Sequence, residues 1–497
     1  MKSPLRPLFI SLFILAILVL ALRTLRPKES NATNLTLYCA AGAKVPVERI
    51  AKQYEDEYGV KIQIEYGGSG TLLSRIEVAP QGDLYLAADN SYIDIAIEKN
   101  LVAESINVAI IKPVIAVPKG NPDNIQSWDD LANPDFRISL ANTEAASIGK
   151  ATQKLLDSIH KWDTIKAQIE KTGVFKPTVN EVANDIKIGA VNAGVVWDAT
   201  VAQYPELEAI VLPESNTFQK HITLAVLNAS ANPTSALRFA RYLTANDRGL
   251  PVFKEEGFPP VQGDQWAARP EITYYAGGVN RVAIEETLAE FSAREGVDIT
   301  TIYNGCGILL GQIKTGGRPD VYHTCDASFM KGVENLFGEV STISSTDIVI
   351  LTHKGNPRDI QTLSDLGNEG LVLGLCNEEQ STLGALTAKM LHSEGIHEAV
   401  SKNVVVTSPT ADLLVSQLTL GKLDAAVVYY ANTKFVRDDT EQIPIDLPGA
   451  VAKQTYTIAN DTAYPNLLKR LHDTINSAQS KERFLEAGFD YLVEVDQ

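Results

Sequence analysis

The chain has 497 residues, too many for one ordinary hydrophobic core, so two or more domains are expected. Its composition, 45% hydrophobic and 21% charged residues, is that of a globular protein. The net charge of −17 argues against nucleic acid as a partner, because phosphate binding needs a basic surface, and four cysteines are too few for a disulfide scaffold.

Residues 1–34 are predicted to be an export signal or a membrane anchor followed by a polar tether. Lys2 and Arg6 precede an apolar run over residues 8–22, and further positive charges follow it. A positively flanked run of about fifteen apolar residues is typical of an export signal, and without an evident cleavage site it can stay in the cytoplasmic membrane as an anchor. A buried core helix is the alternative. Export would place the remainder in the periplasm or on the extracytoplasmic face.

From residue 35 onward, strand and helix patterns alternate, which predicts parallel β–α–β units in a doubly wound α/β fold. A helix with Val47, Ile50 and Tyr54 on one face is expected to end at Gly59. The predicted strands of the first half cover residues 35–41, 61–65, 83–89, 114–117, 137–140 and 194–197, and helices begin near residues 92, 128, 147 and 179.

A glycine-rich stretch over residues 66–76 joins the second strand to a helical pattern. A strand that turns through glycines onto the first turn of a helix leaves backbone N–H groups at the positive end of the helix dipole. This arrangement can hold an anion without a cationic side chain, and Ser69 would add a hydroxyl donor. An ordinary glycine-rich turn is the alternative interpretation.

The second half repeats the first. Gly307 lies in a copy of the glycine-rich stretch, 237 positions after Gly70, and the other landmarks recur in the same order. This period is far too long for a solenoid, so it indicates a duplicated domain. The predicted organisation is a first domain over residues 35–262, a linker over residues 263–270 and a second domain over residues 271–497.

The order of these motifs resembles the periplasmic molybdate-binding proteins of ABC importers. The resemblance rests on the segments 38–42, 66–72, 83–89, 117–122 and 193–197, and it recurs more weakly over residues 271–497. It implies two tandem type-2 periplasmic-binding domains, each with two α/β lobes that close on a hinge. It also implies a small tetrahedral oxyanion as ligand, molybdate or tungstate first, and an ABC permease as partner.

The resemblance assigns ligand-binding positions residue by residue. In the first domain they fall on residues that include one serine and a late tryptophan in place of a tyrosine: Ala41, Gly42, Ser69, Gly70, Ile148, Val179 and Trp197. In the second domain they fall on residues that keep the tyrosine but lack both serines: Gly278, Val279, Cys306, Gly307, Leu383, Ala411 and Tyr429.

The cysteines and a tyrosine pair leave alternatives open for the second domain. Cys306, Cys325 and Cys376 are expected to border its cleft, either as a disulfide between the first two, as buried thiols, or as a soft-ligand site for a thiophilic metalloid. Tyr429 and Tyr430 resemble the tyrosine pair of ferric-iron receptors. A receptor or sensor for ferric iron or a thiophilic metalloid oxyanion is therefore a second hypothesis, in which one domain can lack a ligand. A receptor without a transport role, in which one domain has lost its ligand, is a further alternative.

No arrangement of residues predicts catalysis. The seven histidines are scattered, and none lies in a nucleophile or metallohydrolase motif. The sequence therefore predicts a non-enzymatic binding protein without a cofactor or a defined metal site.

Overall fold

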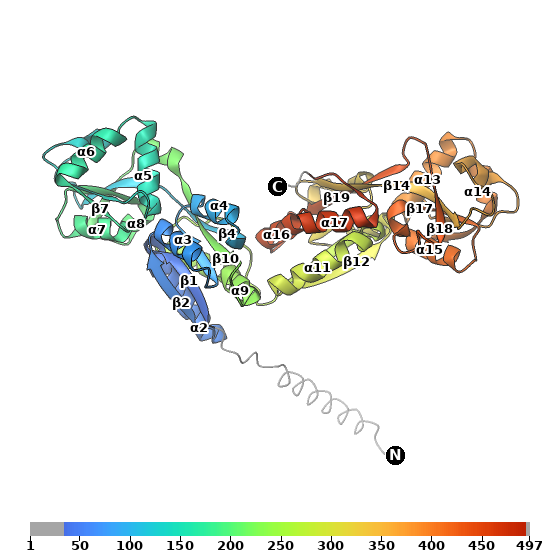
Figure 1. The fold of residues 1–497 in the computed structure, drawn as a ribbon, viewed down its shortest axis with the longest axis horizontal. Coiled ribbons are helices and arrows are strands. Elements are labelled where there is room, and N and C mark those ends of the chain that lie inside the picture. Colours follow the sequence, from blue (N-terminus) through green and yellow to red (C-terminus); the bar gives the residue numbers. More distant parts are fainter. Residues whose placement is uncertain (1–33, 494–497) are drawn as a thin grey trace, which may run out of the picture.

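The computed structural model describes residues 34–493, so the predicted export signal lies outside the described part. No helix within residues 34–493 is long and apolar enough to cross a membrane. The described chain forms four α/β lobes, which we call A and B in the first domain and C and D in the second. Lobes A and C lie next to each other in the centre, and lobes B and D lie at the outer ends (Figure 1).

Lobe A is built on a five-stranded sheet in the order β2-β1-β3-β10-β4, with β1 parallel to β2 and β3 and with β10 antiparallel to its neighbours. Its strands are β1 (Leu35–Ala40), β2 (Ile62–Gly67), β3 (Leu84–Ala87), β4 (Val102–Ile111) and β10 (Lys220–Leu227). Its helices are α2 (Lys44–Tyr58), α3 (Ser69–Val78), α4 (Ser91–Glu98), α9 (Pro233–Leu243) and α10 (Gly249–Glu255).

Lobe B has a second five-stranded sheet in the order β7-β6-β8-β5-β9. Its strands are β5 (Pro113–Pro118), β6 (Ile138–Ala141), β7 (Val174–Lys176), β8 (Ala193–Trp197) and β9 (Leu207–Ile210). Its helices are α5 (Ser147–Ser158), α6 (Trp162–Thr172), α7 (Val179–Lys187) and α8 (Asp198–Ala202).

The local patterns explain why these elements form. Val47, Ile50 and Tyr54 of α2 are all buried, as their helical spacing predicts, and Gly59 ends the helix in a left-handed conformation with φ 70°. Asp83 and Asp89, the acids that flank β3, serve the backbone. Asp83 accepts hydrogen bonds from the Thr36 N–H and the Ser230 hydroxyl, and Asp89 accepts one from the Ser91 N–H.

The second domain repeats the order of the main strands but differs at the hinge. Strand β14 (Ser341–His353) runs without interruption through lobes C and D, pairing with β19 in one and with β17 in the other. In the first domain the same path is divided between β4 and β5, and Pro113 lies where β14 has Ile348. Proline lacks a backbone N–H and cannot continue a ladder on both sides. The two lobes of the second domain therefore share one ten-stranded sheet.

The remaining elements of the second domain follow those of the first, except that short 3-10 turns replace α4 and α8 and that strand β20 is added. In lobe C they are β11 (Glu271–Gly277), β12 (Asp298–Asn304), β13 (Val321–His323), β19 (Val451–Ile458), β20 (Asp490–Tyr491), α11 (Arg281–Glu295), α12 (Cys306–Lys314), α16 (Pro465–Ile475) and α17 (Ala478–Ala487). In lobe D they are β15 (Leu373–Cys376), β16 (Val404–Ser408), β17 (Ala425–Tyr429), β18 (Thr440–Pro444), α13 (Thr382–Ser393), α14 (His397–Asn403) and α15 (Ala411–Thr419).

A buried ionic cluster joins lobe A to lobe C. The carboxylate of Glu295 on α11 accepts hydrogen bonds from Arg241 of α9 at 2.9 Å and from Arg470 of α16 at 2.6 Å. Glu295 is 1% exposed, and Arg241 is 4% exposed. Beside this cluster, Asp264 accepts hydrogen bonds from the backbone N–H groups of Asn466 and Leu467 and so caps the start of α16. The segment predicted as a linker thus takes part in the contact between the domains.

Candidate functional site

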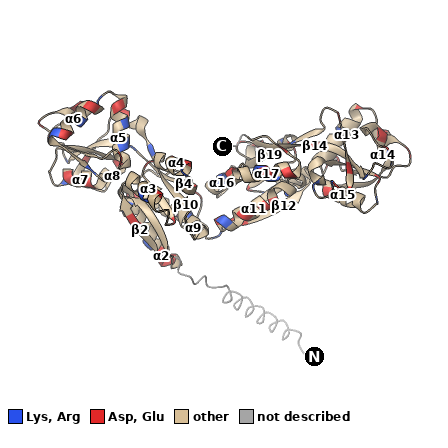
Figure 2. Ribbon diagram, viewed as in Figure 1, with Lys and Arg blue, Asp and Glu red and all other residues tan. Residues whose placement is uncertain are grey.

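A small cavity lies between lobes A and B. Its free volume is about 10 Å³, close to the least that admits one water-sized group. No charged side chain lines it, although acidic and basic residues are interspersed over much of the chain (Figure 2). The lining comprises glycines and alanines, two larger aliphatic residues, three hydroxyls and one indole: Ala40, Ala41, Gly42, Gly67, Gly68, Ser69, Ala88, Ala146, Ser147, Ile148, Thr178, Val179 and Trp197.

Three helices begin at this cavity. The first residues of α3, α5 and α7 are Ser69, Ser147 and Val179, and all three line the cavity. The N-terminus of each helix carries a partial positive charge and N–H groups without intrahelical partners. The site therefore offers positive potential from peptide dipoles, as the glycine-rich stretch predicted for α3 alone. Ser147 was not predicted as a site residue. The pattern that could have indicated it is a serine at the start of a helix that follows an apolar strand.

Ser69 is held in place by the backbone of lobe A. It is 1% exposed, and its Oγ accepts a hydrogen bond from the Ala88 N–H at 3.1 Å. The Tyr85 hydroxyl donates to the Ser69 carbonyl at 2.7 Å. Because the hydroxyl oxygen accepts here, its proton can be donated to a group in the cavity.

Gly42 and Trp197 form the opposite part of the lining. A Cβ at Gly42 would lie 3.1 Å from Cγ1 of Val179 and 3.9 Å from Cδ1 of Trp197, so the absent side chain leaves room at the site. Trp197 ends strand β8, is 2% exposed and has an indole N–H that can act only as a donor. Ala41 and Ile148 also line the cavity, so six of the seven residues predicted for this domain meet there.

The seventh residue, Gly70, has a different position. Its N–H and that of Thr71 donate to the Ala145 carbonyl of lobe B, at 3.1 and 3.2 Å. A Cβ at Gly68 would overlap the Ala145 oxygen, and one at Gly70 would overlap the Glu144 oxygen. The glycines thus let the two lobes approach, and two N–H groups that we expected to face an anion are used to hold the lobes together.

The second domain has the same backbone arrangement with different side chains. Cys306 begins α12 at the position of Ser69, and its Sγ accepts a hydrogen bond from the Cys325 N–H at 3.0 Å, as Ser69 does from Ala88. Val279 stands at the position of Gly42 and is 3% exposed, so its side chain occupies space that is open in the first domain. Gly307 N–H donates across to the Gln380 carbonyl at 3.1 Å. Of the other predicted positions, Gly278, Leu383 and Ala411 are buried.

Tyr429 and Asp412 also distinguish the second cleft. Within the described residues the buried Tyr429 hydroxyl has no hydrogen-bond partner, and burial raises its pKa well above the ordinary value. Asp412, at the position of Asn180, would lie 3.8 Å from a Cβ at Gly278 and donates no proton when ionised. A carboxylate so near the cleft disfavours an anionic ligand.

The metal-binding alternatives find little geometric support. The described residues contain no group of three or more His, Cys, Asp or Glu side chains that could hold a metal ion. His323 faces Tyr274 at 3.0 Å within lobe C, and burial lowers its pKa to about 3. Tyr430 packs under the Arg437 guanidinium at 4.3 Å, whereas Tyr429 faces the thiols. The two tyrosines therefore do not share one site.

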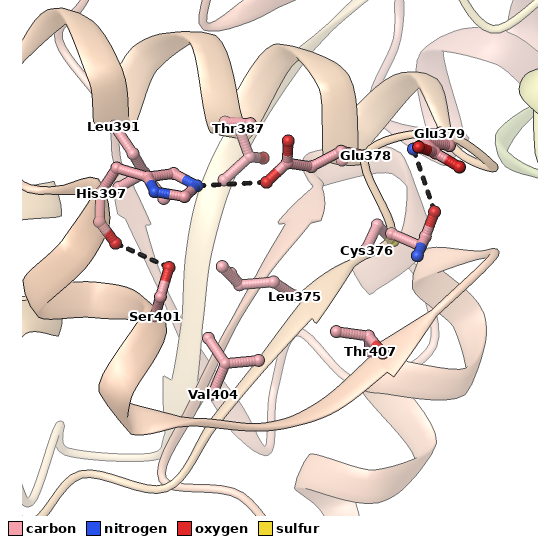
Figure 3. Close-up of a pocket in the computed structure, with 13 residues that line it drawn as sticks. Leu375, Cys376, Glu378, Glu379, Thr387, Leu391, His397, Ser401, Val404 and Thr407 are labelled. Atoms are coloured by element: carbon pink, nitrogen blue, oxygen red, sulfur yellow. Dashed lines mark hydrogen bonds and ion pairs between the residues drawn. The ribbon is translucent and has the colours of Figure 1, made fainter.

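A larger cavity of about 580 Å³ lies in lobe D, outside the cleft (Figure 3). Some of its polar groups are paired, since His397 Nε2 lies 3.1 Å from Glu378 Oε1 and the Ser401 hydroxyl donates to the His397 carbonyl, whereas the buried Thr387 hydroxyl has no hydrogen-bond partner within the described residues. Glu378 and Glu379 both line it, which disfavours an anion. We therefore place the candidate site in the clefts.

The family of bacterial extracellular solute-binding proteins matches residues 35–259 and again residues 272–490. The chain therefore belongs to this family and carries its domain twice, in tandem, with the type-2 periplasmic-binding fold. Solute-binding proteins of this kind are transport components outside the cytoplasm.

Three relatives are similar to about half of the chain. A putative binding protein of Haemophilus influenzae is 29% identical over 232 residues, which cover 47% of this chain and 93% of that protein. A putative ABC transporter substrate-binding lipoprotein of Bacillus subtilis, YvgL, is 25% identical over 234 residues, which cover 46% of this chain and 88% of that protein. The molybdate-binding protein ModA of Escherichia coli is 24% identical over 234 residues, which cover 45% of this chain and 88% of that protein.

Solved structures are similar at lower identity. The substrate-binding domain of a putative molybdenum ABC transporter from Clostridium difficile is 21% identical, with a TM-score of 0.36, over 46% of this chain and all of that one. The periplasmic molybdate-binding protein of Azotobacter vinelandii is 18% identical, with a TM-score of 0.40, over 46% of this chain and all of that one.

Proposed function

We propose that the first domain of this solute-binding protein captures a small tetrahedral oxyanion, molybdate or tungstate first, and delivers it to the permease of an ABC importer. The observation that carries the proposal is the cavity of about 10 Å³ at which three helices begin and which no charged residue lines. Peptide N–H groups and hydroxyls bind an anion there without an opposing charge, and both lobes contribute them.

The chemistry of the lining supports this ligand class. The site is uncharged and offers donors from both lobes, as a compact oxyanion needs, and its free volume of about 10 Å³ means that the lobes must part to admit the ion. The donors proposed to hold the ion are the Ser69 hydroxyl, the Trp197 indole N–H and backbone N–H groups at Ala41, Gly42, Ile148 and Val179, with Gly70 acting through lobe closure. Ser147 adds a second hydroxyl.

We propose a different part for the second domain, which we place at residues 271–497, after the first domain at residues 35–262 and a connection at residues 263–270. Val279 fills the space open at Gly42, Cys306 replaces the serine, and the carboxyl of Asp412 lies close by. These differences favour a cleft that does not hold the same oxyanion. Export and retention at the membrane are assigned to residues 1–34, and the proposed role is non-enzymatic.

Titration calorimetry of the full chain tests the proposal. Molybdate, tungstate, sulfate, phosphate and ferric iron are titrated separately into the purified protein. We expect one equivalent of molybdate or tungstate to bind, with sulfate and phosphate weaker. Absence of heat with every tetrahedral oxyanion would overturn the proposal, and two equivalents would show that the second cleft binds as well. Binding of ferric iron alone would favour the receptor alternative.

A further inference from the structure

The second cleft contains two sulfur atoms in contact. Cys306 Sγ and Cys325 Sγ are 2.9 Å apart, and the two residues are 0% and 4% exposed. We propose that Cys306 and Cys325 form a thiol–disulfide exchange site at the floor of the second cleft, with Cys306 as the attacking sulfur and Cys325 as the resolving one. The assignment is independent of the ligand proposed for the first domain.

The local structure favours attack by Cys306. It is the first residue of the nine-residue helix α12, where the helix dipole stabilises a thiolate. Burial alone would raise the pKa of its thiol, but its hydrogen bonds with the Cys325 thiol and N–H lower it. The hydrogen bond to Cys306 and burial raise the pKa of Cys325, which therefore keeps the shared proton.

The other two cysteines lack these features. Burial raises the pKa of Cys376 to about 12, and burial raises that of Cys39 even further. All four cysteines are unbridged in the structure, and only the pair in the second cleft has its sulfurs in contact among them. Cys39 and Cys376 are therefore matched internal controls for thiol reactivity.

The first domain shows that the fold does not need this pair. Ser69 and Ala88 occupy the same two positions, with the same backbone hydrogen bond from the second residue to the side chain of the first. Replacing Cys306 by serine and Cys325 by alanine thus reproduces an arrangement that the chain already contains. The two thiols are therefore not required for the fold and are available for a chemical role.

The proposed reaction uses an external disulfide as oxidant. The Cys306 thiolate attacks one sulfur of glutathione disulfide, a new S–S bond forms, and one glutathione thiolate leaves. Cys325 then transfers its proton to the released glutathione thiolate and attacks Cys306 Sγ, and the second glutathione thiolate leaves and takes a proton from water. Two protein thiols are oxidised to one disulfide, while one glutathione disulfide is reduced to two glutathione molecules. A reducing dithiol reverses both steps.

Lobe opening controls access to the pair. A Cβ at Gly277 would overlap Cys325 Sγ, so the backbone of β11 covers the pair inside lobe C, and the Gly307-to-Gln380 hydrogen bond closes lobe D over α12. The oxidant must therefore enter while the lobes are apart. Oxidation would also convert the Cys306 thiol, which stands where the first domain has the Ser69 hydroxyl, into one half of a disulfide.

Thiol counting on the full chain tests the proposal. The protein is reduced, freed of reductant and incubated with glutathione disulfide. It is then quenched in acid, denatured and alkylated, and labelled cysteines are counted by mass spectrometry. We expect the number of labelled cysteines to fall from four to two, and peptide mapping to find one bond between Cys306 and Cys325.

Variants keep the result interpretable. Cys376→Ser is the control and is expected to lose two thiols on oxidation, like the parent protein. Cys306→Ser and Cys325→Ala are expected to form no internal disulfide. In Cys325→Ala, Cys306 is expected to retain one glutathione as a mixed disulfide. The oxidised parent is expected to melt at a higher temperature than the reduced one, without such a difference in Cys306→Ser. Four labelled cysteines after oxidation, or a bond that involves Cys376, would overturn the proposal.

Discussion

At the scale of single residues, the two domains differ in side chains carried on the same backbone. Ser69 and Cys306 begin equivalent helices, and both accept a hydrogen bond from an equivalent N–H. A thiol S–H is a weaker hydrogen-bond donor than a hydroxyl O–H, so the first site can hold an oxyanion more strongly than the second. Gly42 and Val279 add a steric difference to this chemical one.

Ser69→Ala removes the hydroxyl donor from the first cleft. A hydrogen bond to a charged ligand contributes about 1.5–3 kcal/mol, so we expect the dissociation constant for molybdate to rise about tenfold to a hundredfold. Titration calorimetry measures it. Ser74→Ala, on the exposed side of the same helix, is the control and should bind like the parent. Equal affinity in both variants would remove Ser69 from the site.

Gly42→Val introduces into the first cleft the side chain of the second. The added methyl groups would extend from a Cβ already 3.1 Å from Val179, so the free volume disappears. We expect molybdate binding to be lost and the melting temperature to fall, since Val279 is accommodated in a domain that has Ala411 at the position of Val179. Val279→Gly, the reciprocal change, should leave binding at the first cleft intact. Retained binding in Gly42→Val would place the ligand elsewhere.

At the scale of elements, the glycine-rich turn between strand and helix serves lobe closure. The N–H groups of Gly70 and Gly307 cross their clefts to the carbonyls of Ala145 and Gln380, and in each case a Cβ would overlap a neighbouring carbonyl oxygen. The hinge differs between the domains, because β14 is continuous and β4 is separated from β5 at Pro113. Closure is therefore expected to be freer in the first domain.

Gly70→Ala tests closure directly. The added Cβ would overlap the Glu144 oxygen, so the closed form should become unfavourable and oxyanion affinity should fall more than tenfold. Small-angle scattering with saturating molybdate should show no contraction relative to the free form. Gly311→Ala is the control, since a Cβ there meets nothing within 4 Å in helix α12, and it should raise stability by about 0.5–1 kcal/mol. A normal contraction in Gly70→Ala would contradict this role.

At the scale of the whole molecule, the two domains are joined through their central lobes. Arg241, Glu295 and Arg470 come from three helices and two lobes; Arg241 and Glu295 are buried, and the Arg470 side chain is 11% exposed. Removing one partner of such a cluster leaves charge uncompensated in a low-dielectric environment, which makes the contact sensitive to any neutral substitution. Figure 1 shows that the outer lobes B and D are free of this contact.

Glu295→Gln is expected to lower the free energy of unfolding by about 3–5 kcal/mol, because two buried arginines lose their counter-charge. Burial would raise the pKa of Glu295, but Arg470 and Arg241 lower it below its ordinary value. A depressed native pKa means that the stabilisation is present above the unfolded pKa of about 4.3 and is lost as the pH falls through the native value. Urea unfolding between pH 7 and pH 3 should therefore show a steeper acid loss in the parent.

Glu285→Gln provides the control for this prediction, because Glu285 forms an exposed pair with Arg281 four residues earlier. Such a pair contributes about 0–1 kcal/mol, so this variant should unfold almost like the parent at every pH. An equal effect of both substitutions would mean that the buried cluster does not hold the domains together.

Sequence pattern alone determined the alternation of strands and helices, the duplication and the fold class. These features depend on local periodicity and on spacing along the chain, which a sequence displays directly. The pattern also indicated Ser69, at the turn between a strand and a helix, and the resemblance to the molybdate-binding proteins added Gly42 and Trp197 to the first cleft. The ligand itself stays a proposal.

Only the tertiary structure decided how these groups are used. The Gly70 N–H donates to a carbonyl 75 residues away, Ser147 joins the lining, and Cys306 and Cys325, for which the sequence left a disulfide, buried thiols and a soft-ligand site open, are unbridged thiols in contact. Tyr430 turns away from Tyr429 towards Arg437, and Glu295 finds its arginines on two other helices. Each of these facts depends on how close two separate segments pack, and no local pattern encodes that distance.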